Sequence, residues 1–160
     1  MIIKVSRGNF EILAKKSLNL KSDCLGAGIA LGFINRSKQI YGLLTYLFPY
    51  KEFDIEIDGA IVLSGETILN KFQEELERIN VDVSACKWFL AGASVYKENP
   101  ENLDLAEKNL KLAESWLKKM GLVEGSVIKK VKLSEPLALE INGKELIFLL
   151  RIQNRIERYE

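Results

Sequence analysis

The sequence contains no histidine, and this absence excludes more chemistry than any other feature of its composition. Imidazole zinc sites, Ser-His-Asp and Cys-His catalysis and histidine proton shuttles all need a residue that this chain lacks. These mechanisms are therefore excluded within the chain itself, and we expect no metal and no cofactor.

Cysteine is also scarce, because Cys24 and Cys86 are the only thiols. They form neither a CxxC pair nor a disulfide framework, so any role they have is individual. A reactive thiol needs a nearby cation, base or helix N-terminus, and Lys21 is the only local cation beside Cys24. Cys24 is therefore interpreted as an ordinary loop cysteine, and Cys86, which precedes a predicted strand, as a core residue.

Long apolar runs and blocks of like charge are absent too. No stretch approaches the roughly 18 apolar residues of a membrane span, and the amino end lacks the apolar run of a signal peptide. The 23 basic and 22 acidic side chains leave a net charge of +1, with no block long enough to act as a nucleic-acid or membrane arm. We expect a cytoplasmic protein that binds no nucleic acid and does not insert into a membrane.

What the chain does have is enough apolar content for a sizeable core. With 160 residues, 48% of them hydrophobic, residues 1–160 fit a single domain. Strand patterns fill the first 50 residues, and "NRSKQ" (35–39) supplies the turn of an antiparallel hairpin between two continuous apolar runs. Such runs are typical of strands that are covered on both faces.

Two helices are predicted in the rest of the chain. Ser64 can cap the first, whose apolar residues recur at helical spacing up to Ile79. Asp104 and Glu107 have the spacing of a capping box for the second, and Gly121 stands where a helix end favours a left-handed residue. Between them, residues 86–96 predict a buried strand.

Three more strands are predicted near the carboxyl end, in residues 127–133, 137–141 and 145–152. Asn142 and Gly143 predict a two-residue hairpin turn. For residues 152–160 we expect a flexible or helical tail. Strands and helices mix without strict alternation, so the pattern favours an α+β fold, with mixed sheets packed together and the two helices outside.

Two clusters of small residues are candidates for close backbone approach. Gly26-Ala27-Gly28 does not match GxGxxG and is not followed by a helix pattern, so it does not predict a phosphate-binding loop. Its amides could bind an oxyanion, or it could serve strand packing alone. Gly92-Ala93-Ser94 raises the same two possibilities.

Taken together, these features resemble the CheD family of chemoreceptor glutamine deamidases. That family carries T-x-G-L-G-S-C, an apolar strand, a short turn and a second strand ending in G-x-x-A-H-x-M-L-P. Residues 22–49, "SDCLGAGIALGFINRSKQIYGLLTYLFP", align with this pattern without a gap. "LAGAS" resembles the family's I-x-G-G-A-S, and Asn109 takes the asparagine of its I-G-x-R-N helix. The resemblance implies the layered CheD-like fold.

The same register implies that the catalytic groups are missing. Ser22 takes the place of the family threonine, but the nucleophilic cysteine falls on Gly28 and the histidine on Thr45. Cys24 lies four residues before the nucleophile position, in line with a family glycine. Family deamidation needs a thiolate to attack the amide and a histidine to manage protons, and neither Gly28 nor Thr45 can do so.

The leading hypothesis is a CheD-like pseudoenzyme that binds a protein partner, which the resemblance implies is a chemoreceptor or a CheC-type phosphatase. The first alternative is a protein-glutamine deamidase or related amide hydrolase that uses Cys24. The second is a small ligand bound in the vestigial pocket. The candidate binding residues are Leu25, Gly26, Ala27, Gly28, Thr45, Gly92, Ala93 and Ser94.

Overall fold

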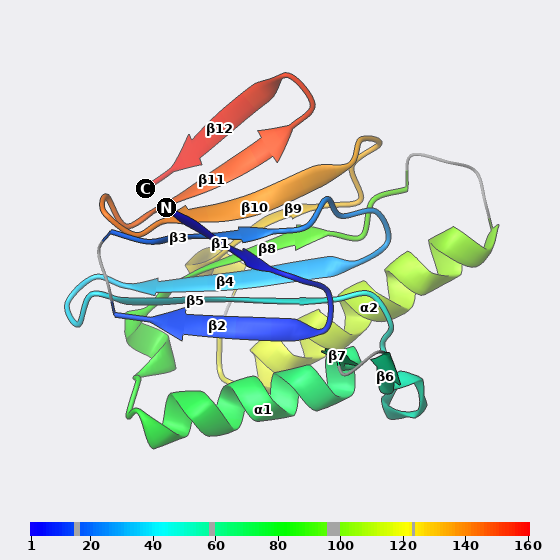
Figure 1. Cartoon of the computed structure of the whole chain (residues 1–160), viewed down its shortest axis with the longest axis horizontal. Coiled ribbons are helices and arrows are strands. Elements are labelled where there is room, and N and C mark those ends of the chain that lie inside the picture. Colours follow the sequence, from blue (N-terminus) through cyan, green and yellow to red (C-terminus); the bar gives the residue numbers. More distant parts are fainter. Residues whose placement is uncertain (15–16, 58–59, 96–99, 123) are drawn as a thin grey trace.

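The fold consists of two five-stranded sheets packed face to face, with two helices against the free face of one of them (Figure 1). We call the sheet that packs against the helices the central sheet. The sheet that packs on its opposite face is called the outer sheet. The computed structural model describes residues 1–14, 17–57, 60–95, 100–122 and 124–160. The order of layers is therefore outer sheet, central sheet, helices.

Each sheet combines parallel and antiparallel neighbours. β1 pairs with β3 in parallel, β8 pairs with β9 in parallel, and the other neighbouring strands are antiparallel. In spatial order the outer sheet contains β1 (Ile2–Val5), β3 (Asn19–Ser22), β10 (Leu137–Asn142), β11 (Ile147–Ile152) and β12 (Arg155–Tyr159). The central sheet contains β2 (Asn9–Leu13), β5 (Ile40–Tyr46), β4 (Ile29–Asn35), β8 (Lys87–Gly92) and β9 (Val127–Val131). This arrangement confirms the α+β prediction.

The smaller elements lie in the connections between these layers. A short hairpin and one 3-10 turn lie between β5 and the first helix, and two further 3-10 turns lie in later connections of the described residues. Their bounds are β6 (Ile55–Ile57), β7 (Ala60–Val62), and 3-10 turns at Lys51–Phe53, Val83–Ala85 and Glu124–Ser126.

The hairpin of β4 and β5 forms the middle of the fold. Every residue of β4 is buried, and so is every residue of β5 after Ile40. The alternating pleat sends Ile29, Leu31 and Phe33 toward the helices and Ala30 and Ile34 toward the outer sheet. Continuous apolar sequence thus reflects burial on both faces, as predicted.

The helices are α1 (Gly65–Arg78) and α2 (Pro100–Lys119), and their N-termini differ in how well the sequence predicts them. Ser64 caps α1 by accepting from the Thr67 amide at 3.4 Å, as expected. The capping box predicted at Asp104 is wrong, because α2 begins with Pro100, a residue that suits the first helical position. Asp104 lies inside the helix and pairs with Lys108 at 2.9 Å.

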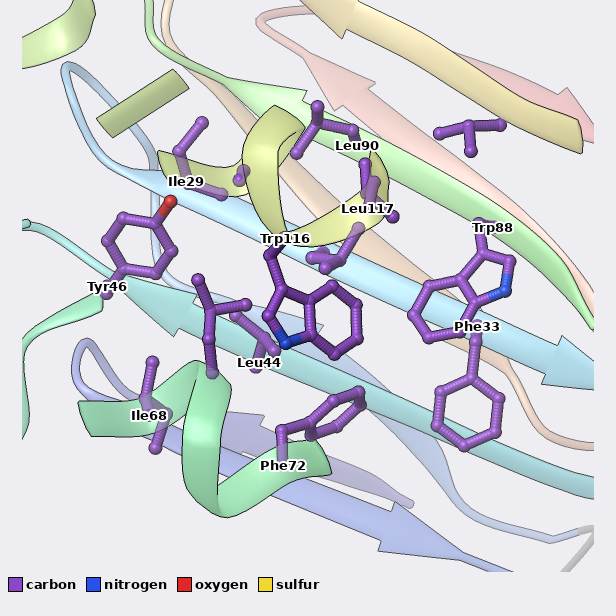
Figure 2. Packing of buried hydrophobic residues seen from close by; sticks show 14 of the residues in the cluster. Ile29, Phe33, Leu44, Tyr46, Ile68, Phe72, Trp88, Leu90, Trp116 and Leu117 are labelled. Carbon is purple, nitrogen blue, oxygen red and sulfur yellow. The ribbon is translucent and has the colours of Figure 1, made fainter. Parts of the chain in front are cut away.

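Aromatic rings join the helices to the central sheet (Figure 2). Phe33 on β4 contacts Phe72 on α1 at 5.7 Å between ring centroids, with an edge-on geometry. Trp88 on β8 contacts Trp116 on α2 at 5.7 Å in the same manner. Edge-to-face pairs of this kind add to the stabilisation from apolar burial, so both helices are fixed to one face of the sheet.

The carboxyl end differs from the expectation of a flexible or helical tail. Residues 155–159 instead form β12, which pairs antiparallel with β11 from Phe148↔Tyr159 to Ile152↔Arg155. Gln153 supplies the positive φ of 46° in the tight turn before it. The pattern of this short polar segment predicts a tail. The edge of β11, however, offers unpaired backbone groups to residues 155–159, and the sequence pattern does not reveal this edge.

The loop between β10 and β11 is longer than the predicted two-residue turn. Asn142 pairs with Ile147, so the loop spans residues 143–146. The Asn142 side chain accepts from the Lys144 and Glu145 amides at 3.0 and 2.9 Å, and these bonds stabilise the wider turn. Gly143 is needed for close approach, since a Cβ there would overlap the Leu18 carbonyl oxygen and the Tyr41 hydroxyl.

Gly143→Ala should lower the free energy of unfolding by about 1–3 kcal/mol, because the added methyl group overlaps the Leu18 carbonyl oxygen and the Tyr41 hydroxyl, which are bonded to each other. The matched control is Gly125→Ala, where a Cβ has nothing within 4 Å and should change stability by less than about 0.5 kcal/mol. Urea unfolding of both variants measures the difference. Equal effects would contradict the close approach.

Candidate functional site

The structure brings the two small-residue clusters together, although more than sixty residues separate them in sequence. The Gly28 carbonyl accepts from the Ala93 amide at 2.8 Å, and the Gly26 carbonyl accepts from the Ser94 amide at 2.8 Å. Gly28 and Gly92 precede and end neighbouring strands, since Ile29 pairs with Gly92. We call the two segments, 26–28 and 92–94, the small-residue site.

Small residues are required here by backbone geometry. Gly92 has a φ of 115°, and a Cβ on it would overlap the Gly28 carbonyl oxygen. Ala93 has a φ of 48°, a left-handed conformation that costs a non-glycine residue roughly 1–2 kcal/mol. The surrounding hydrogen bonds therefore hold the site in a conformation that larger side chains would oppose.

Gly28, which the sequence alignment predicts to occupy the position of the family nucleophile, is buried and lies against the backbone at the end of β5. A Cβ built on it would lie 2.9 Å from the Tyr46 carbonyl oxygen and 3.6 Å from the Leu47 Cα. Backbone atoms cannot swing aside as the end of a flexible side chain can. The end of β5 therefore closes over the point where a thiol would begin.

Thr45, which the sequence alignment predicts to occupy the position of the family histidine, is fully buried and already hydrogen bonded. Its hydroxyl donates to the Ser6 carbonyl at 2.8 Å, and its own carbonyl accepts from the Gly8 amide at 2.8 Å. In the sheet it pairs with Ala30 on one side and Asn9 on the other. Thr45 thus joins the segment between β1 and β2 to the central sheet, and a hydroxyl of this kind does not titrate near neutral pH.

Ser22 and Leu25 fix the segment that leads into the site. The Ser22 hydroxyl donates to the Asp23 carbonyl at 2.9 Å and accepts from the Leu139 amide at 3.0 Å. Leu25 is buried, and its amide donates to the Leu137 carbonyl at 2.6 Å. Both residues therefore anchor residues 22–25 to β10, and neither side chain is exposed for chemistry.

Asn109 on α2 holds the site together, although the sequence indicates it only through the family asparagine and the set of candidate binding residues omits it. Its side-chain amide donates to the Ala27 carbonyl at 3.0 Å and to the Leu47 carbonyl at 2.7 Å. The Tyr46 hydroxyl donates to the Asn109 backbone carbonyl at 2.6 Å, and burial raises the pKa of Tyr46 far above its ordinary value. One buried side chain thus links α2 to both sides of the site.

Cys24 lies outside this packed region and is exposed. It lines a cavity of about 430 Å³ on the outer sheet, in which the Lys4 ammonium pairs with the Asp23 carboxylate at 3.2 Å. The residues that line this cavity are Ile2, Lys4, Lys21, Ser22, Asp23, Cys24 and Ala138. The structure therefore separates Cys24, as an exposed group, from the buried position of Gly28.

Cys86 is a buried thiol with a structural contact. Its Sγ donates to the Asp82 carbonyl at 3.4 Å, and burial raises its pKa to about 11. In the part of the chain that the structure describes, no group of three or more acidic or thiol side chains is placed to hold a metal ion. Among the same residues, neither helix is long and apolar enough to cross a bilayer.

Thiol labelling should separate the two cysteines. At about pH 8, a pKa near 11 leaves only about one Cys86 thiol in a thousand ionised, whereas Cys24 is open to solvent. A chromogenic disulfide reagent should therefore titrate one thiol rapidly in the native protein and the second only after unfolding. Cys24→Ala should abolish the fast phase, and a fast phase that survives in this variant would contradict the assignment.

Asn109→Leu should lower the free energy of unfolding by about 2–4 kcal/mol, because one buried and one part-buried carbonyl lose their donor and the two methyl groups need more room than the amide. The control is the same substitution at Asn70, which is exposed on α1 and should change stability by less than about 0.5 kcal/mol. Thermal and urea unfolding of both variants give the comparison. Equal losses would show that Asn109 does not hold the site.

Comparisons with known proteins indicate what this chain resembles in sequence and in fold. No protein-family model matches the chain. Over 125 residues it is 28% identical to the probable chemoreceptor glutamine deamidase CheD of Methanococcus vannielii, covering 76% of this chain and 77% of that protein. The crystal structure of the hypothetical protein YfiH of Bacillus licheniformis aligns with a TM-score of 0.51 and 10% identity, over 78% of this chain and 51% of that one. This chain thus spans about half the length of YfiH, and the likeness concerns the fold alone. The relative from Methanococcus vannielii confirms the resemblance to the CheD family.

Proposed function

We propose that this chain is a cytoplasmic CheD-like protein that has lost the deamidase nucleophile and base and acts as a non-catalytic protein-binding module in chemotaxis signalling. The observation that carries the proposal is the closed geometry at Gly28, where a Cβ would lie 2.9 Å from the Tyr46 carbonyl oxygen. A nucleophile at this position would require the backbone of β5 to move.

The chemistry of deamidation makes this loss severe. A thiolate must attack the glutamine amide, and an acid-base partner, typically worth 10² to about 10⁴ in rate, must manage the protons. Thr45 donates its hydroxyl to the Ser6 carbonyl, and the sequence contains no histidine that could take over. The chain therefore lacks both partners of the reaction at the aligned positions.

The scaffold around the lost groups is nevertheless well ordered by specific bonds. Asn109 bonds Ala27 and Leu47, and Ala93 and Ser94 bond Gly28 and Gly26. These bonds favour one conformation of the site, although the Asn109 Oδ1 is buried without a partner among the described residues. This supports a role in which the shape of the surface near Gly26 is used and the reaction is not. The relative from Methanococcus vannielii is a probable chemoreceptor glutamine deamidase, which makes a chemoreceptor the first partner to test. The family resemblance makes a CheC-type phosphatase the second.

A deamidase or amide hydrolase that uses Cys24 is the alternative, favoured only by the exposure of that thiol and the cavity that it lines. A small ligand in the vestigial pocket is less favoured, because Gly28 and Thr45 are buried and Gly28 is enclosed by backbone. The activity test below separates the enzyme from the binding module.

The test uses purified cytoplasmic fragments of the host's chemoreceptors and its CheC-type phosphatase. We expect saturable binding to at least one of them, and no conversion of glutamine to glutamate in the receptor fragments by mass spectrometry. Cys24→Ala should leave binding unchanged, since this thiol has no assigned role in it. Gly26→Arg, which places a large cation on the half-buried surface of the small-residue site itself, should weaken binding by about tenfold or more.

Two outcomes would overturn the proposal. Receptor deamidation that disappears in Cys24→Ala would establish the enzyme. Absence of binding to every receptor fragment and to the phosphatase would remove the proposed partners.

A further inference from the structure

A second candidate site lies between the two helices, where none of the residues of the small-residue site takes part. A cavity of about 230 Å³ opens between α1 and α2. Leu69 and Leu112 provide apolar walls from opposite helices, and Trp116 provides an aromatic one. The lining residues are Glu66, Leu69, Asn70, Leu112, Ser115, Trp116 and Lys119, and we call this cavity the interhelix groove.

Trp116 carries a hydrogen-bond donor that the fold leaves unused. The residue is 5% exposed, and its Nε1 is buried without an acceptor among the described residues. In Figure 2 this nitrogen is turned toward α1, the opposite wall of the groove. The other tryptophan differs, because Trp88 Nε1 donates to the Val83 carbonyl at 3.0 Å. A buried N–H without an acceptor is unfavourable, so an acceptor brought by a ligand would relieve it.

The charged side chains at the rim of the groove indicate which charge the acceptor group of a ligand should carry. Lys119 is exposed at the groove and forms no ion pair within the described part of the chain. Glu66 stands on the α1 side, and its carboxylate accepts from the Lys51 amide at 2.8 Å. One free cation attracts a single negative charge, while the nearby carboxylate opposes a second one.

We propose that the interhelix groove binds a small monocarboxylate with an apolar body. The carboxylate accepts from Trp116 Nε1 and from the Lys119 ammonium, and the body packs between Leu69 and Leu112. A movement of an exposed lining side chain gives the carboxylate access to the covered N–H, on the fast timescale of surface rotamers. The cavity lies below the usual 300–1,000 Å³, roughly, of drug-sized ligands, which favours a body no larger than one ring or a branched chain.

The experiment follows the two indole N–H resonances by ¹⁵N–¹H NMR, since the chain has 2 tryptophans. The probes are phenylacetate, 4-methylpentanoate and benzoate, and 2-phenylacetamide is the neutral control of nearly the same shape as phenylacetate. At least one carboxylate should shift the Trp116 resonance in a saturable way with a Kd of about 1 mM or lower. The Trp88 resonance should shift less, because its N–H donates to the Val83 carbonyl and the residue does not line the groove, and Trp116→Phe assigns the two signals.

Lys119→Gln tests the charge without disturbing the core, because this residue is exposed. It should raise the Kd of the carboxylate about tenfold and leave the two indole signals of the free protein unchanged. The proposal is overturned if none of the three carboxylates moves the Trp116 signal at about 10 mM, roughly ten times the expected Kd. It is also overturned if the neutral amide binds equally well or if Lys119→Gln has no effect. Partner binding is not needed for this test, so its outcome is independent of the proposed function.

Discussion

The amide of Asn109 is the contact on which the candidate site depends. By donating to Ala27 and Leu47, it bonds α2 to the segment before β4 and to the end of β5 at once. Loss of one buried donor would leave two carbonyls unpaired, which is costlier than losing two exposed bonds. The same turn of α2 accepts the Tyr46 hydroxyl, so the helix and the sheet are joined by polar bonds as well as by apolar packing.

The close approach at this point limits which side chains fit without a backbone shift. The backbone of β5 lies against Gly28, and a Cβ on Gly92 would overlap the Gly28 carbonyl oxygen. A Cβ at Gly28 would lie 2.9 Å from the Tyr46 carbonyl oxygen, so a side chain there requires the end of β5 to move. The free thiol of Cys24 is a few residues away in sequence, yet it opens onto the outer sheet and a different environment. Cys24 is therefore not part of the small-residue site, although it is close to that site in sequence.

The sequence predicts elements well where local signals agree. Ser64 caps α1 because capping depends on residues within one turn, and β4 and β5 form their hairpin because the apolar runs and the turn stand side by side in the chain. At Asp104 a capping pattern competes with Pro100, and the helix begins at the proline. Residues 155–159 carry alternating charges with no strand signal of their own, and they become β12 through pairing with β11. The sequence did not indicate that residues 26–28 bond to residues 92–94, or which group bonds the Thr45 hydroxyl, because both depend on contacts between distant segments.

By itself the sequence determined the class of the fold, the two helices, the resemblance to the CheD family and the absence of histidine, because composition, periodicity and spacing are local properties. Only the tertiary structure decided that Gly28 is closed by backbone, that Thr45 is bonded to Ser6, and that Asn109 connects the parts of the site. It alone also brought Leu69, Trp116 and Lys119 to one groove. These features depend on which elements pack together, and packing between distant segments is set by the burial of the whole core.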